Sequence, residues 1–325
     1  GGTSPYSYSW DNGQVGQQLQ SVSAGTYLCT ITDSNSCQTT QLVSVNEPTV
    51  LVLSILSVDS VSCNGLSDGG ASVLASGSTP SYSYQWSNSQ TGTQLQNVSS
   101  GNYSCTATDY NGCQQTVLVT VKQPDILSSL IQNVDSVLCY GQSNGGGSII
   151  AQGGTSPYSY SWDNGQVGPI LQNVSAGSYV CTITDQNSCV TTQTLTVDEP
   201  DDLLVTLSKI NITCNGLSDG QAFASVTGGT PSYTYLWSNG GNSAAVGSLP
   251  LGSYSCAVVD NNGCSVFSDT ITITQPTVLT SSVLSVDSVN CNGGSDGSAV
   301  VSGFGGTSPY SYSWDNSQVG QQLQS

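Results

Sequence analysis

A repeat at a fixed interval constrains this chain more than any other feature of its sequence. The prolines Pro48, Pro124, Pro200 and Pro276 are evenly spaced. The tryptophans keep the same interval to within one position, at Trp10, Trp86, Trp162, Trp237 and Trp314. Residues 1–21 return almost unchanged at 305–325. Because such an array repeats one structural unit, we expect its function to belong to the array and not to a single pocket.

The prolines also predict the domain organisation. If each module ends at its proline, residues 49–124, 125–200 and 201–276 are three complete modules. Residues 1–48 are then the C-terminal part of a preceding module, and residues 277–325 are the N-terminal part of a following one. We therefore expect the chain to be a window from a longer array. A unit this short buries a modest core and needs covalent links or neighbours for stability.

Cysteine supplies a candidate link. Each complete module has three cysteines, and the two intervals between them are the same every time: Cys63, Cys105 and Cys113; Cys139, Cys181 and Cys189; Cys214, Cys256 and Cys264. The chain has no histidine and no C-x-x-C motif, so this pattern indicates disulfides and not zinc. Disulfides in turn predict an oxidising, extracellular or cell-surface location.

The net charge of −18 excludes one class of partner. Lys122 and Lys209 are the only cations in the sequence. Nucleic acid is excluded because phosphate contacts need Lys and Arg, and an anionic membrane surface is disfavoured for the same reason. We expect no membrane insertion in this segment, and we interpret the charge as keeping a long polymer soluble.

The residue pattern predicts strands and no helices. Polar and apolar residues alternate with period two, and turn residues recur at the short intervals typical of small β domains. Tyr82, Tyr84 and Trp86 share one face of a strand, and the polar residues Ser83 and Gln85 between them suit a solvent face. We expect this stripe to be core and not a sugar-binding platform. Six or seven short antiparallel strands per module predict an all-β tandem array of immunoglobulin-like sandwiches. Modules follow one another almost without linkers, which favours an elongated rod.

Three ordered motifs resemble a known family. They are Cys-Asn-Gly-x-Ser-Asp-Gly at 63–69, Gly-Gly-Thr-Pro-x-Tyr-x-Tyr-x-Trp at 228–237, and Gly-x-Tyr-x-Cys-x-x-x-Asp-x-Asn-Gly-Cys at 101–113. Together they resemble the SprB repeat of very large Bacteroidetes surface adhesins, including those of gliding motility. The resemblance implies a secreted, surface-attached, multi-module protein. One departure is a cysteine where the family more often has an aliphatic residue: Cys29, Cys105, Cys181 and Cys256.

The resemblance also implies a disulfide pairing within each module. The first and last cysteines resemble a pair, which gives Cys63–Cys113, Cys139–Cys189 and Cys214–Cys264. The middle cysteine, whose partner is unknown, faces the core and reads as a buried free thiol. A competing interpretation bridges the middle and last cysteines across the final hairpin, which frees the first cysteine to link neighbouring modules or chains. Spacing alone does not decide between the two.

Catalysis is not expected. Without histidine, a Ser or Cys nucleophile lacks its usual base, and the carboxylates are not paired at one place in every module. Calcium is the only cofactor with candidate ligands. They are Asp68, Asp219 and Asp296, which occupy the same turn in three different modules. Asn144 replaces this aspartate in one module, so we favour Asx turns over a metal site.

Covalent glycans are expected partners. Ser60, Ser136, Ser288 and Thr270 lie in Asp-Ser/Thr-aliphatic sequences that resemble the O-glycan acceptor of Bacteroidetes. Asn97, Asn102, Asn173 and Asn211 lie in N-glycan sequons. The plainer interpretation is that these are polar residues on solvent-exposed strand faces.

Two functions remain open from the sequence. The first is a structural segment of a long extracellular filament or adhesin stalk that supports adhesion or gliding motility, with copies of itself or neighbouring modules as partners. The second is an array of modules that each bind a ligand, such as a glycan or a calcium-dependent partner. Exposed aromatic residues at module tips would favour the second, and only Tyr110, Tyr140 and Phe304 are candidates.

Overall fold

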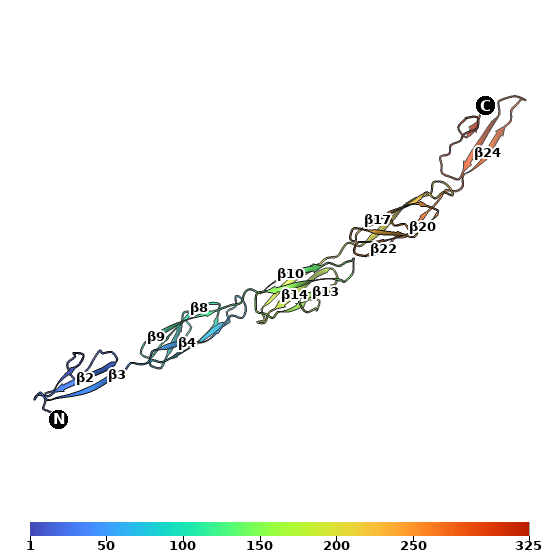
Figure 1. The fold of residues 1–325 in the computed structure, drawn as a ribbon. Coiled ribbons are helices and arrows are strands. Elements are labelled where there is room, and N and C mark those ends of the chain that lie inside the picture. Colours follow the sequence, from blue (N-terminus) through green and yellow to red (C-terminus); the bar gives the residue numbers. More distant parts are fainter. Residues whose placement is uncertain (325) are drawn as a thin grey trace. The chain divides into compact units, whose positions relative to one another are not determined.

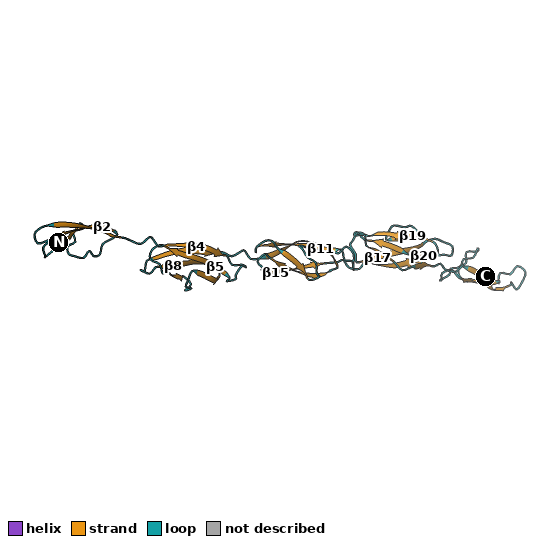
Figure 2. Ribbon diagram, turned by 90° about the horizontal axis from the view of Figure 1, so that it is seen from below, coloured by secondary structure: helices purple, strands orange, loops and turns teal. Residues whose placement is uncertain are grey.

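The computed structural model describes residues 1–324, and all of its regular structure is β (Figure 1, Figure 2). Every strand pairing that is resolved in register is antiparallel. The chain is a tandem array of immunoglobulin-like sandwiches, as the sequence predicts. No helix in this part of the chain is long and apolar enough to cross a bilayer.

Residues 49–124 show the plan of one module. One sheet has the order β4-β5-β7, from β4 (Val52–Asp59), β5 (Gly69–Ser76) and β7 (Gln94–Val98). The other sheet has the order β6-β8-β9, from β6 (Ser83–Trp86), β8 (Gly101–Thr108) and β9 (Gln114–Val121). Six strands in two sheets, with their apolar residues between them, form the predicted sandwich.

The next two stretches repeat this plan. The sheets of residues 125–200 are β10-β11-β13 and β12-β14-β15, from β10 (Ser128–Asp135), β11 (Gly145–Gln152), β12 (Ser159–Trp162), β13 (Ile170–Val174), β14 (Gly177–Thr184) and β15 (Val190–Val197). In residues 201–276 the last two strands are interrupted, which gives the orders β16-β17-β19, β18-β21-β22 and β20-β23. Their bounds are β16 (Leu204–Ile210), β17 (Gly220–Thr227), β18 (Thr234–Trp237), β19 (Ala245–Leu249), β20 (Gly252–Tyr254), β21 (Cys256–Val259), β22 (Ser265–Phe267) and β23 (Ile271–Ile273).

Each end of the described chain holds one sheet. At the N-terminal side, β1 (Ser7–Trp10), β2 (Gly25–Thr32) and β3 (Gln38–Val45) correspond to the second sheet of a module. The C-terminal side holds the counterpart of the first sheet of a module, formed by β24 (Thr280–Asp287), β25 (Ser298–Phe304) and β26 (Gln322–Leu323). We call these two parts the half-modules.

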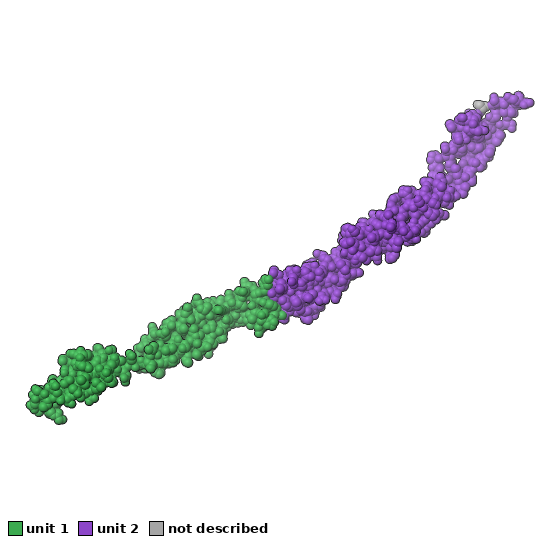
Figure 3. Space-filling view, in the orientation of Figure 1, with its two compact units in different colours: residues 1–128, 152–158, 184–191 green, residues 129–151, 159–183, 192–325 purple. Residues whose placement is uncertain are grey.

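The chain divides into two compact units (Figure 3). Unit 1 comprises residues 1–128, 152–158 and 184–191, and unit 2 comprises residues 129–151, 159–183 and 192–325. This division is coarser than the predicted modules. The boundaries at 48, 124, 200 and 276 therefore stay predictions.

The core of residues 49–124 forms around Trp86. This side chain is fully buried together with Leu95, Cys105 and Val119, and its indole N–H donates to the carbonyl of Gly92 at 3.0 Å. The tyrosines of the stripe, Tyr82 and Tyr84, are half-buried against this cluster. A large aromatic side chain with a satisfied N–H is a strong core element, and the stripe is core as expected from the alternation.

Strand directions place the two cysteine-bearing turns at opposite ends of this module. The first turn, residues 60–68, lies beside the module's exit, since Val61 N–H donates to Lys122 O at 2.8 Å and Asn64 Nδ2 donates to Pro124 O at 3.0 Å. The last hairpin, residues 109–113, lies beside its entry. There Asp109 Oδ2 accepts from the hydroxyl of Ser78, whose backbone N–H donates to Thr49 O. A first turn at the exit and a last hairpin at the entry can face each other only across consecutive modules.

Candidate functional site: a disulfide-linked junction between modules

Two disulfides join consecutive modules. Cys63 is bonded to Cys189 and Cys139 to Cys264, at sequence separations of 126 and 125 residues. In each case the first cysteine of one module is paired with the third cysteine of the next. The first bond lies within unit 1 and the second within unit 2.

This pairing corrects the prediction made from the family resemblance. The pairs Cys63–Cys113, Cys139–Cys189 and Cys214–Cys264 are wrong, because Cys189 and Cys264 are bonded elsewhere and Cys113 and Cys214 are free. The physical reason is the placement of the two turns. A disulfide requires Cα atoms within about 7 Å, and turns at opposite ends of one sandwich do not approach that closely.

The middle cysteines take no part in the junction. Cys29, Cys105, Cys181 and Cys256 are buried and free. Burial raises the pKa of the Cys105 thiol, and of the equivalent Cys181 and Cys256. The competing interpretation placed a bridge between the middle and last cysteines of each module. That pairing is therefore wrong. Its consequence, a first cysteine that links neighbouring modules, holds for Cys63 and Cys139.

An acidic side chain shapes the turn that carries the first cysteine. Asp68 Oδ1 accepts from the backbone N–H of Ser62 at 3.0 Å, and Oδ2 accepts from the Ser62 hydroxyl. These bonds hold the pKa of Asp68 below its usual value, with the hydroxyl the larger cause. Asp219 and Asp296 bind Thr213 and Asn290 in the same way.

Asn144 shows what this position requires. Its side-chain oxygen Oδ1 accepts from Leu138 N–H at 3.0 Å, the same bond that Asp68 makes to Ser62. The turn therefore needs an acceptor and does not need a charge. The calcium candidates Asp68, Asp219 and Asp296 use their oxygens as acceptors within the turn. Among the described residues, no three His, Cys, Asp or Glu gather as a metal site.

A buried aspartate holds the hairpin that carries the third cysteine. Asp185 Oδ1 accepts from the backbone N–H groups of Asn187 and Cys189, both at 2.9 Å, and Oδ2 accepts from Thr155 N–H at 2.8 Å. Asp109 and Asp260 make the equivalent bonds to Cys113 and Cys264. All three aspartates are only 5% exposed. Each fixes the direction in which its cysteine leaves the hairpin.

An asparagine two positions before the third cysteine completes the junction. Asn187 Nδ2 donates to Ser62 O of the preceding module at 2.9 Å and to Thr155 Oγ1 at 3.1 Å. Asn262 Nδ2 donates likewise to Leu138 O at 3.0 Å and to Thr230 Oγ1 at 2.9 Å. The sequence alone does not reveal this role, because the acceptor lies in another module. The signal is its fixed place in Asp-x-Asn-Gly/Ser-Cys.

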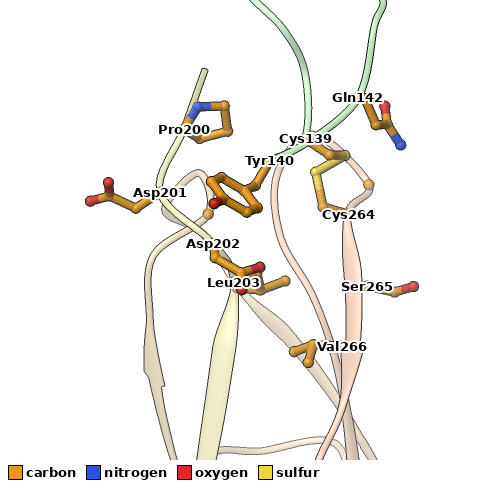
Figure 4. A pocket seen from close by; sticks show the side chains of 12 residues that line it. Cys139, Tyr140, Gln142, Pro200, Asp201, Asp202, Leu203, Cys264, Ser265 and Val266 are labelled. Atoms are coloured by element: carbon orange, nitrogen blue, oxygen red, sulfur yellow. A yellow bond between two sulfur atoms is a disulfide. The ribbon is translucent and has the colours of Figure 1, made fainter. Parts of the chain in front are cut away.

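A cavity of about 350 Å³ lies beside the second disulfide (Figure 4). The Tyr140 ring and the Cys139–Cys264 bond line it, together with the chain that leads into the next module, Pro200, Asp201, Asp202 and Leu203. Tyr140 is 57% exposed. Of the other aromatic candidates, Tyr110 and Phe304 are also exposed.

The predicted glycan acceptors all lie on the surface. Ser60, Ser136, Ser288, Thr270, Asn97, Asn102, Asn173 and Asn211 are exposed. Two of the amides have internal partners, since Asn102 Oδ1 accepts from the Thr120 hydroxyl and Asn211 Oδ1 accepts from Thr274 N–H. Exposure permits modification but does not demonstrate it, and these acceptors stay predictions.

Comparison with known sequences identifies the repeat. The family model described as the SprB repeat matches four times, at residues 55–91, 131–167, 206–242 and 283–319. No curated protein matches the chain. Each match begins in the first strand of a module and ends after its Tyr-x-Tyr-x-Trp stripe, so it includes the first cysteine but not the other two.

Several solved structures match this chain at low similarity. Sidekick-1 immunoglobulin domains 1–5 match with 12% identity and a TM-score of 0.35, covering 83% of this chain and 74% of that one. Drosophila OTK extracellular domains 3–5 match with 12% identity and a TM-score of 0.24, covering 67% and 99%. Domains 1–6 of the surface layer protein SbsC match with 12% identity and a TM-score of 0.26, covering 98% and 54%. The sheet topology, and not these likenesses, supports the immunoglobulin-like assignment.

Proposed function

Because the chain belongs to the SprB-repeat family, we propose that it is a structural stretch of a long extracellular repeat protein. The protein forms a surface filament or an adhesin stalk and serves adhesion or gliding motility. The observation that carries this proposal is the disulfide between consecutive modules, found at Cys63–Cys189 and Cys139–Cys264. Its partners are copies of itself or neighbouring modules, with glycans attached to its exposed Ser, Thr and Asn residues.

The two disulfides support a mechanical role because their loops overlap. Residue 139, where the second loop begins, lies inside the first loop, 63–189. The shortest covalent path through the chain therefore runs to Cys63, crosses to Cys189, returns to Cys139 and crosses to Cys264. Residues 64–138 and 190–263 lie outside this path. The oxidised chain can then extend no further than this path allows, even when its modules unfold.

The same bonds support an extracellular location. Structural disulfides persist in oxidising compartments and are rare where thiols are kept reduced. The charge of −18, with two lysines, suits a long polymer that must stay soluble and must not adhere to anionic surfaces. No arrangement of nucleophile and base accompanies the junction, since the sequence has no histidine.

Single-molecule stretching tests the mechanical proposal. The chain is pulled from its two ends with and without a reductant, and the full extension is compared. At about 3.4 Å per residue, the bypassed residues add on the order of 500 Å when the bonds are reduced. The C63S/C139S variant should reach this longer extension without reductant. Equal extension of the oxidised and reduced wild-type chain would contradict the proposal.

The biological role needs a test on the producing cells. Antibody labelling of intact cells should place the repeat array at the surface. An in-frame deletion of whole repeats should shorten the surface structure and reduce attachment or gliding. A repeat array found only inside intact cells would contradict the location, whatever the stretching experiment shows.

A further inference from the structure

Four cysteines of this chain are exposed and unpaired: Cys37, Cys113, Cys214 and Cys291. Their positions are not random. Cys37 and Cys113 are third cysteines of the first two modules, whereas Cys214 and Cys291 are first cysteines of the last two. In both disulfides that form, a first cysteine is bonded to the third cysteine of the next module. If every module follows this pairing, the partner of each of these four cysteines lies outside residues 1–325.

The sequence contains a second, longer period that brings these cysteines into register. Residues 1–21 recur at 305–325 with one difference, Gly13 against Ser317. We call the shift along the sequence from residue 1 to position 305 the displacement. Applied to the cysteines, it moves Cys37 to position 341 and Cys113 to position 417.

These displaced positions match the spans of the bonds that form. Cys63–Cys189 spans 126 residues and Cys139–Cys264 spans 125 residues. The interval from Cys291 to position 417 equals the longer of these two spans, and the interval from Cys214 to position 341 exceeds it by one. A single displacement therefore satisfies both remaining pairs.

The exposed faces of the two half-modules fit the same displacement. Each exposes apolar side chains that a complete module buries: Val43 is 37% exposed where its equivalent Val119 is 1% exposed, and Leu279 is 62% exposed where Leu51 is 7% exposed. One half-module holds the first sheet and the other the second. Residues 277–304 of one copy and 1–48 of the next together are as long as the complete module 49–124. Joining them would cover both apolar faces with their usual partners.

Thr307 and Thr213 are in contact at the place that corresponds to the two formed junctions. Thr307 Oγ1 donates to Thr213 O at 3.5 Å. Thr213 precedes Cys214 as Ser62 precedes Cys63, and Thr307 corresponds to Thr155. On the other side, Asn35 Nδ2 donates to Thr3 Oγ1 at 2.9 Å, as Asn187 Nδ2 does to Thr155 Oγ1. The donor Asn35 is therefore held as Asn187 is, whereas the Thr213 carbonyl, which corresponds to the acceptor Ser62 O, is bound by Thr307 in place of an asparagine.

We propose that these four cysteines are the open positions of one continuous disulfide ladder. Cys214 bonds the cysteine at position 37, and Cys291 bonds the cysteine at position 113, of a further copy of this four-module repeat. Each bond forms when two thiols lose two protons and two electrons to a disulfide oxidant, such as oxidised glutathione, which is reduced to two thiols. The further copy is either a second chain or a continuation of the same chain.

Oxidation of the purified chain tests the pairing. Residues 1–325 are reduced, diluted into a glutathione redox buffer at several protein concentrations, and analysed on non-reducing gels and by mass spectrometry of disulfide-linked peptides. We expect head-to-tail covalent oligomers whose amount rises with concentration, with Cys37–Cys214 and Cys113–Cys291 as their linking peptides. Symmetric pairs such as Cys37–Cys37, or a random mixture of the four, would overturn the proposal.

Matched variants and a tandem chain test the pairing further. The C37S and C214S variants should each lose the Cys37–Cys214 linking peptide and keep the Cys113–Cys291 peptide. The retained peptide shows that each variant still folds, so each variant controls for the other. A tandem chain of residues 1–304 followed by 1–325 keeps the period. In it, both pairs should form across the internal boundary of a single chain and be found in the monomer fraction at every protein concentration, while the four outermost cysteines stay open to link chains. If the tandem chain leaves Cys214 and Cys291 unpaired at its internal boundary, the proposal is wrong.

Discussion

Cys63 is bonded to Cys189 in the next module, although Cys113 in its own module is nearer in sequence. The reason lies in the course of the strands: β5 returns from the first turn to the module's entry, and β8 returns to the entry again before the last hairpin. The hairpin of one module is thereby presented to the exit of the module before it. One cysteine in each of the two turns then suffices to link any number of identical modules.

Removing one of these bonds should loosen a junction and leave the sandwiches folded. For C63S we expect the modules on either side to lose roughly 2–5 kcal/mol of stability, the usual range for a native disulfide. Calorimetry of dilute, monomeric chain should show part of the unfolding transition moved to lower temperature. C113S is the matched control, since Cys113 has no partner within the chain. An equal shift in both variants would show that the loss is not due to the junction.

Thiol reactivity should divide the free cysteines into two classes. Cys37, Cys113, Cys214 and Cys291 are exposed and should react with an aromatic disulfide reagent within the mixing time in mildly alkaline buffer. Cys105, Cys181 and Cys256 are buried, and burial raises the pKa of each thiol. These three should react only after the chain is unfolded in denaturant. Rapid labelling of Cys105 in the native protein would contradict its placement in the core.

Acid should weaken the hairpins that Asp109 and Asp260 hold, because the pKa of each carboxyl is lowered in the fold. The Ser78 hydroxyl and the backbone N–H groups of Cys113 and Thr79 hold the pKa of Asp109 below 3.8, against the effect of burial. Since the folded pKa is the lower one, the stabilisation is complete above pH 3.8 and is lost as the pH falls below it. Urea midpoints measured from neutral to strongly acidic pH should therefore fall in this acidic range. In D109N this fall should be smaller, and an unchanged pH profile would exclude Asp109 as its source.

Asp68 should tolerate loss of its charge but not loss of its oxygen. Asn144 performs the same task in the next module, accepting from Leu138 N–H where Asp68 accepts from Ser62 N–H. We expect D68N to melt at the same temperature as wild type and D68A to melt a few degrees lower, because the alanine leaves the Ser62 N–H without its acceptor. Thermal melts with and without calcium should agree for both variants. A calcium-dependent rise in wild type alone would favour a metal role for this turn.

The sequence allowed much of the fold to be predicted, because periodicity is a local signal. Alternation predicted the strands, and Trp86 with its two tyrosines predicted the core, since side chains of one strand face share one environment. The disulfide pairing could not be predicted in the same way. It depends on which end of the sandwich each turn occupies, and hence on the direction of every strand between Cys63 and Cys113. The role of Asn187 was hidden for the same reason, because its acceptor lies 125 residues away in another module.

Disulfide mapping of the oxidised protein shows whether consecutive modules are linked to one another or each module is closed on itself. With only two lysines, the chain is better cut at aspartate or aromatic residues than with trypsin, under conditions that prevent thiol exchange. We expect linked peptides containing Cys63 with Cys189 and Cys139 with Cys264, and Cys105 and Cys181 recovered as free thiols. Linked peptides containing Cys63 with Cys113 and Cys139 with Cys189 would contradict it, because each module would then be closed on itself.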